Sequence, residues 1–168
     1  VTDDTGTIFK TISRSADGSE IIELVKNGSY TINGYKYTTD NLGRIIKVEF
    51  QDMKLKPTGK SRRPIADTLK AIGRGFERNG DDRGHLIADR FMGDNTLSNI
   101  VAMDGNINKG QYKMVEDAIA EELEKGNKVR GAISITYPDT KSFRPESFEY
   151  VYNAGSGDII TKIMNYID

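Results

Sequence analysis

The run Asp82-Arg83-Gly84-His85 holds the single histidine of the chain, so any imidazole chemistry must use His85. A neutral imidazole can take a proton from water near neutral pH. Arg83 carries a planar guanidinium that suits phosphate oxygens, and Gly84 lets the backbone take an unusual conformation close to a ligand. Hydrolysis of a phosphodiester needs a group that activates the nucleophile, an anion clamp and a countercharge for the leaving oxygen. This run supplies the first two.

The countercharge is expected from a cation bound further along the chain, where Asn106, Asn108, Tyr112 and Glu116 follow one another. If a helix begins near Asn108, then Asn108, Tyr112 and Glu116 point broadly one way, because residues four apart share a helix face. An Asn amide oxygen suits Mg²⁺, which keeps most of its waters and takes one or two protein ligands. Glu116 would then hold a metal-bound water. The residues alone leave an alternative open, in which the asparagines are turn and cap residues and Glu116 is solvated surface.

Length and composition indicate a globular chain. The 168 residues suit one domain with a sizeable core. The sequence contains no long apolar run, so it predicts no membrane span. The absence of cysteine excludes disulfides, Cys-ligated zinc and thiol nucleophiles. The first residue is Val1 and no signal segment follows, so we interpret the sequence as a domain cut from a longer protein.

The charge is unevenly distributed along the chain. The formal net charge is -1, whereas nucleic-acid binders often have a basic surplus. Residues 54–90 hold ten Lys or Arg against five Asp or Glu, and residues 116–124 are acidic. A basic side on an acidic protein fits this pattern, although charge alone favours a solvated surface of mixed charge.

The elements that must position these residues are mostly strands. Asn33-Gly34 is a hairpin signal between two β-prone runs, and apolar residues alternate with charged ones over residues 44–55. Residues 56–81 look irregular. The other runs with strand character are Thr7 to Ile12, Glu20 to Val25, Arg83 to Ile87, Leu97 to Met103, Val129 to Tyr137, Ser147 to Asn153 and Ile159 to Ile167.

One segment, Gln111 to Lys125, predicts a helix. Its apolar residues are expected along one side and are Met114, Val115, Ala118, Ile119 and Leu123. Strands with one helix of this length predict an α+β fold with a largely antiparallel sheet.

Two segments resemble a known family. Asp82-Arg83-Gly84-His85 resembles the DRGH signature of the DNA/RNA non-specific endonucleases, which belong to the ββα-metal, or His-Me finger, nucleases. Ser98-Asn99-Ile100, Asn108-Lys109-Gly110 and Glu116-Asp117 resemble the metal-binding stretch of that family in residue type and spacing. The match covers about residues 81–117, with weaker resemblance through the closing strands.

The resemblance implies a ββα-metal core and a role for each matched residue. His85 would be the general base, Asn108 the direct ligand of Mg²⁺ (or Mn²⁺), and Glu116 the holder of a metal-bound water. Arg83 would contact phosphate, and Asp82 would orient other residues of the motif. The metal would stabilise the transition state and the 3′-oxygen leaving group, so the products would carry 5′-phosphates.

The resemblance also leaves gaps. Members of the family normally have a further arginine near the scissile phosphate. The resemblance does not show which residue takes that place, and the candidates are Arg62, Arg63, Arg74 and Arg78. The predicted phosphate-binding set contains Arg83, Arg74 and Arg78. Ala102-Met103 stands where family members often have Pro-Gln, so any role of that Gln is absent.

The compact pattern resembles most the C-terminal toxin domains of secreted bacterial proteins, among them nuclease effectors exported by type VII secretion systems. This likeness implies action in the cytoplasm of a target cell and a cognate immunity protein that blocks the site in the producing cell. We expect one nuclease domain over residues 1–168 with its ββα-metal core in residues 54–168. Residues 1–53 are either part of that fold or an accessory platform.

The expected function is a Mg²⁺-dependent endonuclease with weak sequence preference, because such enzymes contact the backbone rather than base edges. Double-stranded DNA is the first substrate and RNA the second. Two other classes stay open. One is a nucleic-acid-binding module without catalysis, and the other is an interaction domain that binds an inhibitor or secretion partner. The oligomeric state is not predicted.

Overall fold

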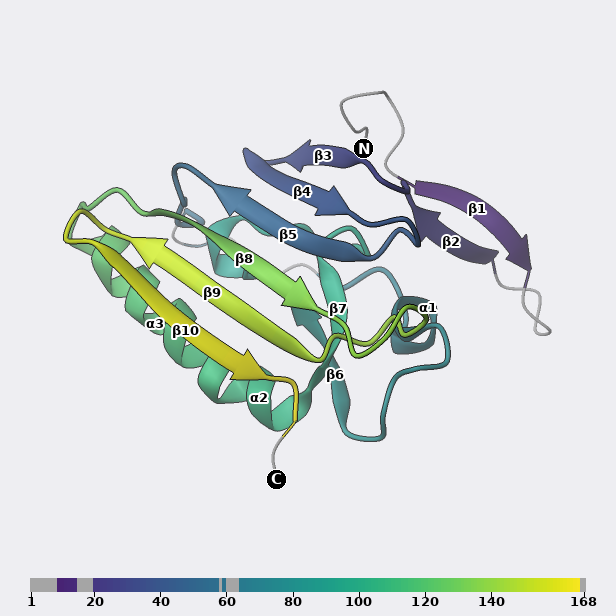
Figure 1. Ribbon diagram of the computed structural model, residues 1–168. Helices are drawn as coiled ribbons and strands as arrows, with labels where there is room; N and C mark the ends of the chain where they lie inside the picture. The colour runs from purple at the N-terminus through teal and green to yellow at the C-terminus, as the bar shows by residue number, and fades with distance from the viewer. Residues whose placement is uncertain (1–8, 15–19, 58, 60–63, 167–168) are drawn as a thin grey trace.

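A six-stranded antiparallel sheet, in the order β10-β9-β8-β5-β4-β3, forms the centre of the computed structural model (Figure 1). Two smaller sheets, β1-β2 and β6-β7, lie beside it. The structure describes residues 9–14, 20–57, 59 and 64–166. The strands are β1 (Phe9–Arg14), β2 (Glu20–Leu24), β3 (Ser29–Ile32), β4 (Tyr35–Thr39), β5 (Ile45–Phe50), β6 (Asp81–His85), β7 (Ile100–Asp104), β8 (Arg130–Thr136), β9 (Ser147–Asn153) and β10 (Asp158–Met164).

The helices are few and mostly short. They are α1 (Leu69–Gly73), the 3₁₀ turn η1 (Asp89–Phe91), α2 (Gly105–Lys109) and α3 (Gln111–Glu124). Within the described residues, no helix is both long and apolar enough to cross a bilayer. The predicted α+β class with a largely antiparallel sheet is confirmed.

The β3–β4 hairpin forms where its turn signal lies. Asn33 and Gly34 have positive φ angles of 55° and 88°, as a two-residue hairpin turn requires, and Ile32 pairs with Tyr35 across it. Tyr35 and Tyr37 of β4 are buried while Lys36 between them is exposed, which is the period-two pattern of a half-buried strand. Residues 29–50 therefore supply three strands of the same sheet as the closing strands β8 to β10.

Helix α3 lies across one face of the sheet, behind β8 to β10 (Figure 1). Its Tyr112 ring packs edge-on against Phe148 and Tyr150 of β9, with ring centroids 5.4 and 5.6 Å apart. The expectation that Met114 faces the core was wrong, since 70% of this residue is exposed. Val115 and Ile119 are buried as predicted, and Tyr112 and Ala120 complete the buried stripe.

This helix begins at Gln111, as predicted. The possibility that it begins near Asn108 is wrong, because Gly110, with φ -109° and ψ -104°, separates α2 from α3. Asn108 therefore lies on a short helix of its own that follows β7 directly, and Asp104 caps that helix by accepting from the backbone N–H groups of Asn106 and Ile107. Strands β6 and β7 with helices α2 and α3 make the ββα unit.

The segment expected to be irregular contains one turn of helix. Thr68 caps α1, and its hydroxyl accepts a hydrogen bond of 3.1 Å from the backbone N–H of Ala71. Arg62 and Arg63, two of the four candidate arginines, lie outside the described residues.

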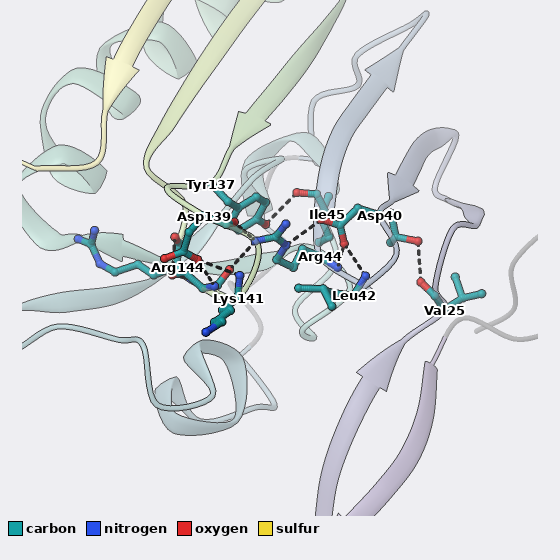
Figure 2. Close-up of polar contacts among 11 residues, drawn as sticks. Val25, Asp40, Leu42, Arg44, Ile45, Tyr137, Asp139, Lys141 and Arg144 are labelled. Atoms are coloured by element: carbon teal, nitrogen blue, oxygen red, sulfur yellow. Dashed lines mark hydrogen bonds and ion pairs between the residues drawn. The ribbon is translucent and has the colours of Figure 1, made fainter.

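Arg44 ties the β4–β5 turn to the β8–β9 loop, as Figure 2 shows. Its Nε donates to Oδ2 of Asp40 at 2.7 Å, and Nη1 donates to the backbone carbonyl of Asp139 at 2.8 Å. The guanidinium lies over the ring of Tyr137, 4.4 Å from its centroid. The loop between β8 and β9 is thus held against the sheet, and the side chain of Arg144 extends from it away from Arg44 (Figure 2).

Arg144 connects the loop between β8 and β9 to Asp81, the first residue of β6. Its Nε and Nη2 donate to the two carboxylate oxygens of Asp81 at 2.8 and 3.0 Å, and 7% and 1% of the two side chains are exposed. Nη2 also donates to the backbone carbonyl of Asn165, just after β10. The fully buried amide of Asn165 accepts from the backbone N–H of Asp104 and donates to the carbonyl of Ala102. Both strands of the ββα unit are therefore fastened by residues that follow β8 and β10.

Candidate active site

A cleft of about 740 Å³ brings most of the predicted site residues together. Its walls come from β6, the segment after β6, α2, α3 and the residues around the start of α1. The predicted residues that line it are Asp82, Arg83, His85, Asn108 and Glu116.

His85, the last residue of β6, is held in one orientation by Asn95. Only 6% of His85 is exposed, and its Nε2 lies 2.8 Å from Oδ1 of Asn95. The Asn95 amide nitrogen donates to Oδ1 of Asp89 at 3.4 Å, which turns the amide oxygen toward the imidazole. Nε2 therefore carries the proton and donates it, and Nδ1 holds the lone pair that a general base needs. No pattern in the sequence selects Asn95, which lies in the segment between β6 and β7.

Asp89 anchors this arrangement. Its Oδ2 accepts from Nζ of Lys56 at 2.8 Å in a mostly buried ion pair. Burial by itself would raise the pKa of the Asp89 carboxyl, but hydrogen bonds from Lys56 and Asn95 hold it below its usual value. Asp89 is therefore ionised at neutral pH, and the order Lys56, Asp89, Asn95, His85 forms a continuous chain of polar contacts.

Asn108 is oriented by the aspartate of the motif. Its Nδ2 donates to Oδ2 of Asp82 at 3.1 Å, and Nζ of Lys109 lies 3.2 Å from the same oxygen. Within the described part of the chain, Oδ1 of Asn108 accepts no hydrogen bond, and Glu116 lies on the wall of the same cleft. An amide oxygen, a carboxylate and room for water are the donor set that Mg²⁺ takes, so the residues fit this ion.

Gly84 has a different role from the one expected. It is buried within β6, and its φ angle is not positive, so the prediction of an unusual backbone conformation was wrong. A Cβ at this position would lie 2.7 Å from Cβ of Met103 on the paired strand. The motif therefore needs glycine because β6 and β7 pack closely there.

The candidate arginines lie in different places, and only some of them line the cleft. Arg83 lines the cleft, and its Nη1 donates to the carbonyls of Asp67 and Ile65 at 3.1 and 3.4 Å. Arg74 does not line it; its Nη1 lies 3.5 Å from a carboxylate oxygen of Glu23 and its guanidinium lies over the ring of Phe143. Arg78 is exposed and also absent from the cleft walls. The structure thus does not bring Arg74 and Arg78 to His85.

Other cations stand in the cleft instead. Arg90, Lys109 and Lys113 line it, and sequence reasoning did not select them. Arg90 and Lys113 both contact Asp117, with Nη2 at 2.5 Å and Nζ at 3.1 Å from its carboxylate oxygens. The hydrogen bond from Arg90, then that from Lys113, lowers the pKa of Asp117.

The family model for the DNA/RNA non-specific endonucleases matches residues 26–156 of this chain. The chain belongs to the DNA/RNA non-specific endonuclease family. It is therefore a nuclease, a hydrolase that acts on nucleic acid, and the predicted family is confirmed. Among the alternatives, membership favours the enzyme over a binding module or an interaction domain.

The curated relatives of this endonuclease are longer proteins. Over 149 residues the chain is 30% identical to the type VII secretion system protein EssD of Staphylococcus aureus strain USA300. The same identity holds for the proteins of strains NCTC 8325 and Newman. The aligned part is 85% of this chain but 24% of the relative, so the endonuclease spans about a quarter of their length.

Solved structures share the endonuclease fold. NucA from Streptococcus agalactiae with a magnesium ion bound matches with a TM-score of 0.62 and 18% identity, over 88% of this chain and 80% of NucA. NucA with no metal bound matches with a TM-score of 0.59 and 15% identity, over 98% and 86%. The predicted ββα-metal fold is confirmed.

Proposed function

We propose that this chain is a Mg²⁺-dependent endonuclease that hydrolyses the DNA backbone with weak sequence preference. The observation that carries the proposal is the shared cleft, in which a buried histidine oriented by Asn95 faces the same space as Arg83, Asn108 and Glu116. The solved NucA structure that holds a magnesium ion supports the choice of metal.

In the proposed reaction His85 is the general base. Nδ1 takes a proton from water while the water oxygen forms a bond to phosphorus and the bond from phosphorus to the 3′-oxygen breaks. The products are a 5′-phosphate and a 3′-hydroxyl, whose oxygen receives its proton from solvent. Asn95 keeps the imidazole in the tautomer that this step requires, because Nε2 already carries a proton.

The other cleft residues bind and orient. Arg83 contacts the scissile phosphate through its guanidinium. Asn108 would hold Mg²⁺ through Oδ1, with Asp82 fixing its amide, and Glu116 would orient water beside the ion. When bound there, Mg²⁺ supplies positive charge that offsets the charge on the phosphate and on the leaving oxygen.

The cleft walls favour a backbone substrate over a particular base sequence. Their cations, Arg83, Arg90, Lys109 and Lys113, suit phosphate oxygens, which carry no sequence information. Double-stranded DNA is the proposed first substrate, with RNA second.

A gel assay with the purified chain tests this function. Plasmid DNA, single-stranded DNA and RNA are incubated with Mg²⁺, with Mn²⁺ and with EDTA. We expect degradation that needs the divalent ion and that His85→Ala abolishes without changing the circular dichroism spectrum. Intact DNA after incubation with folded, Mg²⁺-loaded wild-type chain would overturn the proposal.

Asn106 offers a matched control for the metal ligand. Both asparagines lie on α2, but Asn106 is exposed and does not line the cleft. Asn108→Ala should raise the Mg²⁺ concentration needed for half-maximal activity and lower the maximal rate, whereas Asn106→Ala should change neither. Equal Mg²⁺ titrations for the two variants would move the ligand elsewhere.

We also propose that the chain is the nuclease domain of a longer effector exported by a type VII secretion system, acting in the target cell. The name of the EssD relatives and the quarter of their length that it spans support this. The producing cell then needs an immunity protein that blocks the cleft. Expression in a bacterial cytoplasm should degrade the chromosome and stop growth with wild type but not with His85→Ala; equal growth of both strains would contradict a toxin role.

A further inference from the structure

Two cations on the cleft wall share one carboxylate. Arg90 directly follows Asp89 in η1, and Asp89 supports Asn95. Lys113 lies on α3, three residues before Glu116 and so on the same side of the helix. Both line the cleft, whereas the Asp117 carboxylate that they share does not. The guanidinium of Arg90 is further steadied by the ring of Phe91, 5.3 Å from its centroid.

Three carboxylates of the cleft walls, Asp81, Asp89 and Asp82, each have a cation of their own. Asp81 is bound by Arg144 and Asp89 by Lys56, and these pairs are mostly buried. Asp82 is contacted by Lys109. Arg90 and Lys113 differ from these pairs, because two cations share the single carboxylate of Asp117.

The ion pairs of Arg90 and Lys113 with Asp117 are also easier to break than the mostly buried pairs described above. The exposed fractions of the Arg90, Lys113 and Asp117 side chains are 39%, 57% and 48%. Exposed ion pairs contribute little to stability, so Asp117 can be replaced as the partner of both cations at small cost. A backbone phosphodiester presents the same single negative charge on two oxygens and belongs to a polyanion, so a guanidinium beside an ammonium suits it well.

We propose that Arg90 and Lys113 form a second phosphate subsite, which binds a backbone phosphate next to the scissile one. Asp117 occupies this subsite in the free enzyme and is displaced by the substrate. The inference rests on the proposed nuclease function and deepens it, because it makes the preferred substrate a strand that extends beyond the cleaved linkage.

The subsite predicts opposite effects for its members. Lys113→Ala and Arg90→Gln each remove a phosphate contact, so the Kd for DNA should rise roughly threefold to fivefold, the range of an exposed charge pair. The slope of log K against log salt should flatten by about 0.9. Asp117→Asn removes the competing carboxylate, so the Kd should fall.

The same helix provides the matched controls. Glu121 of α3 and Lys125, the residue that caps the end of α3, form another pair four residues apart, with Nζ and Oε1 at 3.6 Å, and neither lines the cleft. Lys125→Ala and Glu121→Gln should keep the wild-type Kd and salt slope. They correct for the change in net charge that every variant of this kind introduces.

The experiment measures fluorescence anisotropy of a labelled DNA duplex with each full-length variant in EDTA over a salt series, alongside kcat and KM for cleavage in Mg²⁺. The expected result is a changed Kd, salt slope and KM for the Arg90, Lys113 and Asp117 variants, with kcat affected less. If the wild type cleaves DNA but these variants bind like Lys125→Ala and Glu121→Gln, the subsite is wrong and the nuclease function stands. If the Kd values change as expected but the wild type does not cleave, the subsite stands and the proposed function falls.

Discussion

Replacing Asn95 tests whether the orientation of His85 matters for turnover. Asn95→Ala removes the oxygen that lies 2.8 Å from Nε2 of His85, and only 6% of each residue is exposed. A buried donor left without its partner costs about 1–3 kcal/mol. The imidazole can avoid that cost by turning or by moving its proton to Nδ1, and in either state it cannot take a proton from the attacking water.

The expected loss follows from this cost. Because a change of about 1.4 kcal/mol is tenfold in an equilibrium, the population of correctly oriented imidazole falls roughly tenfold to hundredfold. The kcat should fall by the same factor. Asn95 does not line the cleft, so KM should change little.

The assay is steady-state cleavage of linear duplex DNA at saturating Mg²⁺, with thermal unfolding of each variant. Asn99→Ala is the control, since the side chain of Asn99 is fully buried and bonds both backbone groups of Ile87 and the hydroxyl of Tyr37. Asn99→Ala should lower Tm more than Asn95→Ala does, and Asn95→Ala should lower kcat more than Asn99→Ala does. A kcat for Asn95→Ala within about twofold of wild type would refute the reasoning.

Three further predictions concern the frame of the site. Gly84→Ala should destabilise the chain by roughly 1–3 kcal/mol, because the new Cβ meets Met103, and Met103→Ala should restore part of that loss in thermal unfolding; a lone Gly84→Ala with wild-type Tm would contradict the packing argument. Arg144→Met should cost about 3–5 kcal/mol, since it leaves the buried charge of Asp81 unpaired, and adding Asp81→Asn should recover part of it in urea unfolding, whereas full stability of the single variant would exclude this role. The pKa of Asp89 is lowered in the folded state, so its stabilisation is complete above its usual pKa and is lost as pH falls through the folded value. Asp89→Asn should therefore be less stable than wild type near about pH 7 and no less stable in strong acid, and a difference independent of pH would count against this linkage.

Local signals in the sequence predicted most of the sheet. The turn residues Asn33 and Gly34 demand positive φ. The alternation of apolar residues predicted the burial of Val48 and Phe50, although Ile45 rather than Ile46 is buried at the start of β5. The predicted helix over residues 111–125 is found as Gln111–Glu124. The helix α1 escaped prediction because one turn of helix is too short for a period of 3.6 residues to be visible.

The buried side of α3 could not be chosen from apolar residues alone. Met114 and Ala118 are four apart and form an apparent stripe, but Tyr112, Val115 and Ile119 form another at three and four residues. The packing of Tyr112 against β9 decides between them, and that contact depends on tertiary structure.

The site residues also divide into those that the sequence could predict and those that depend on tertiary structure. Asp82, Arg83, His85, Asn108 and Glu116 could be selected because they lie in two short runs with recognisable spacing, and their chemical roles stay predictions. The supporting partners of His85 could not, because they come from a segment without periodicity and from a lysine before α1. Arg83 could not be distinguished from Arg74 and Arg78 by their charge for a related reason: charge in the sequence does not tell which side chains the fold turns into the cleft.

Asn165 has a consequence for the order of assembly. It follows β10, yet it holds the backbone of β7 at Ala102 and Asp104, and its carbonyl receives the arginine that grips Asp81. In a polypeptide still leaving the ribosome, the DRGH run is complete before Asn165 can make these contacts. Because Asn165 follows β10, the contacts that fasten β7 and Arg144 form only once β10 has been made.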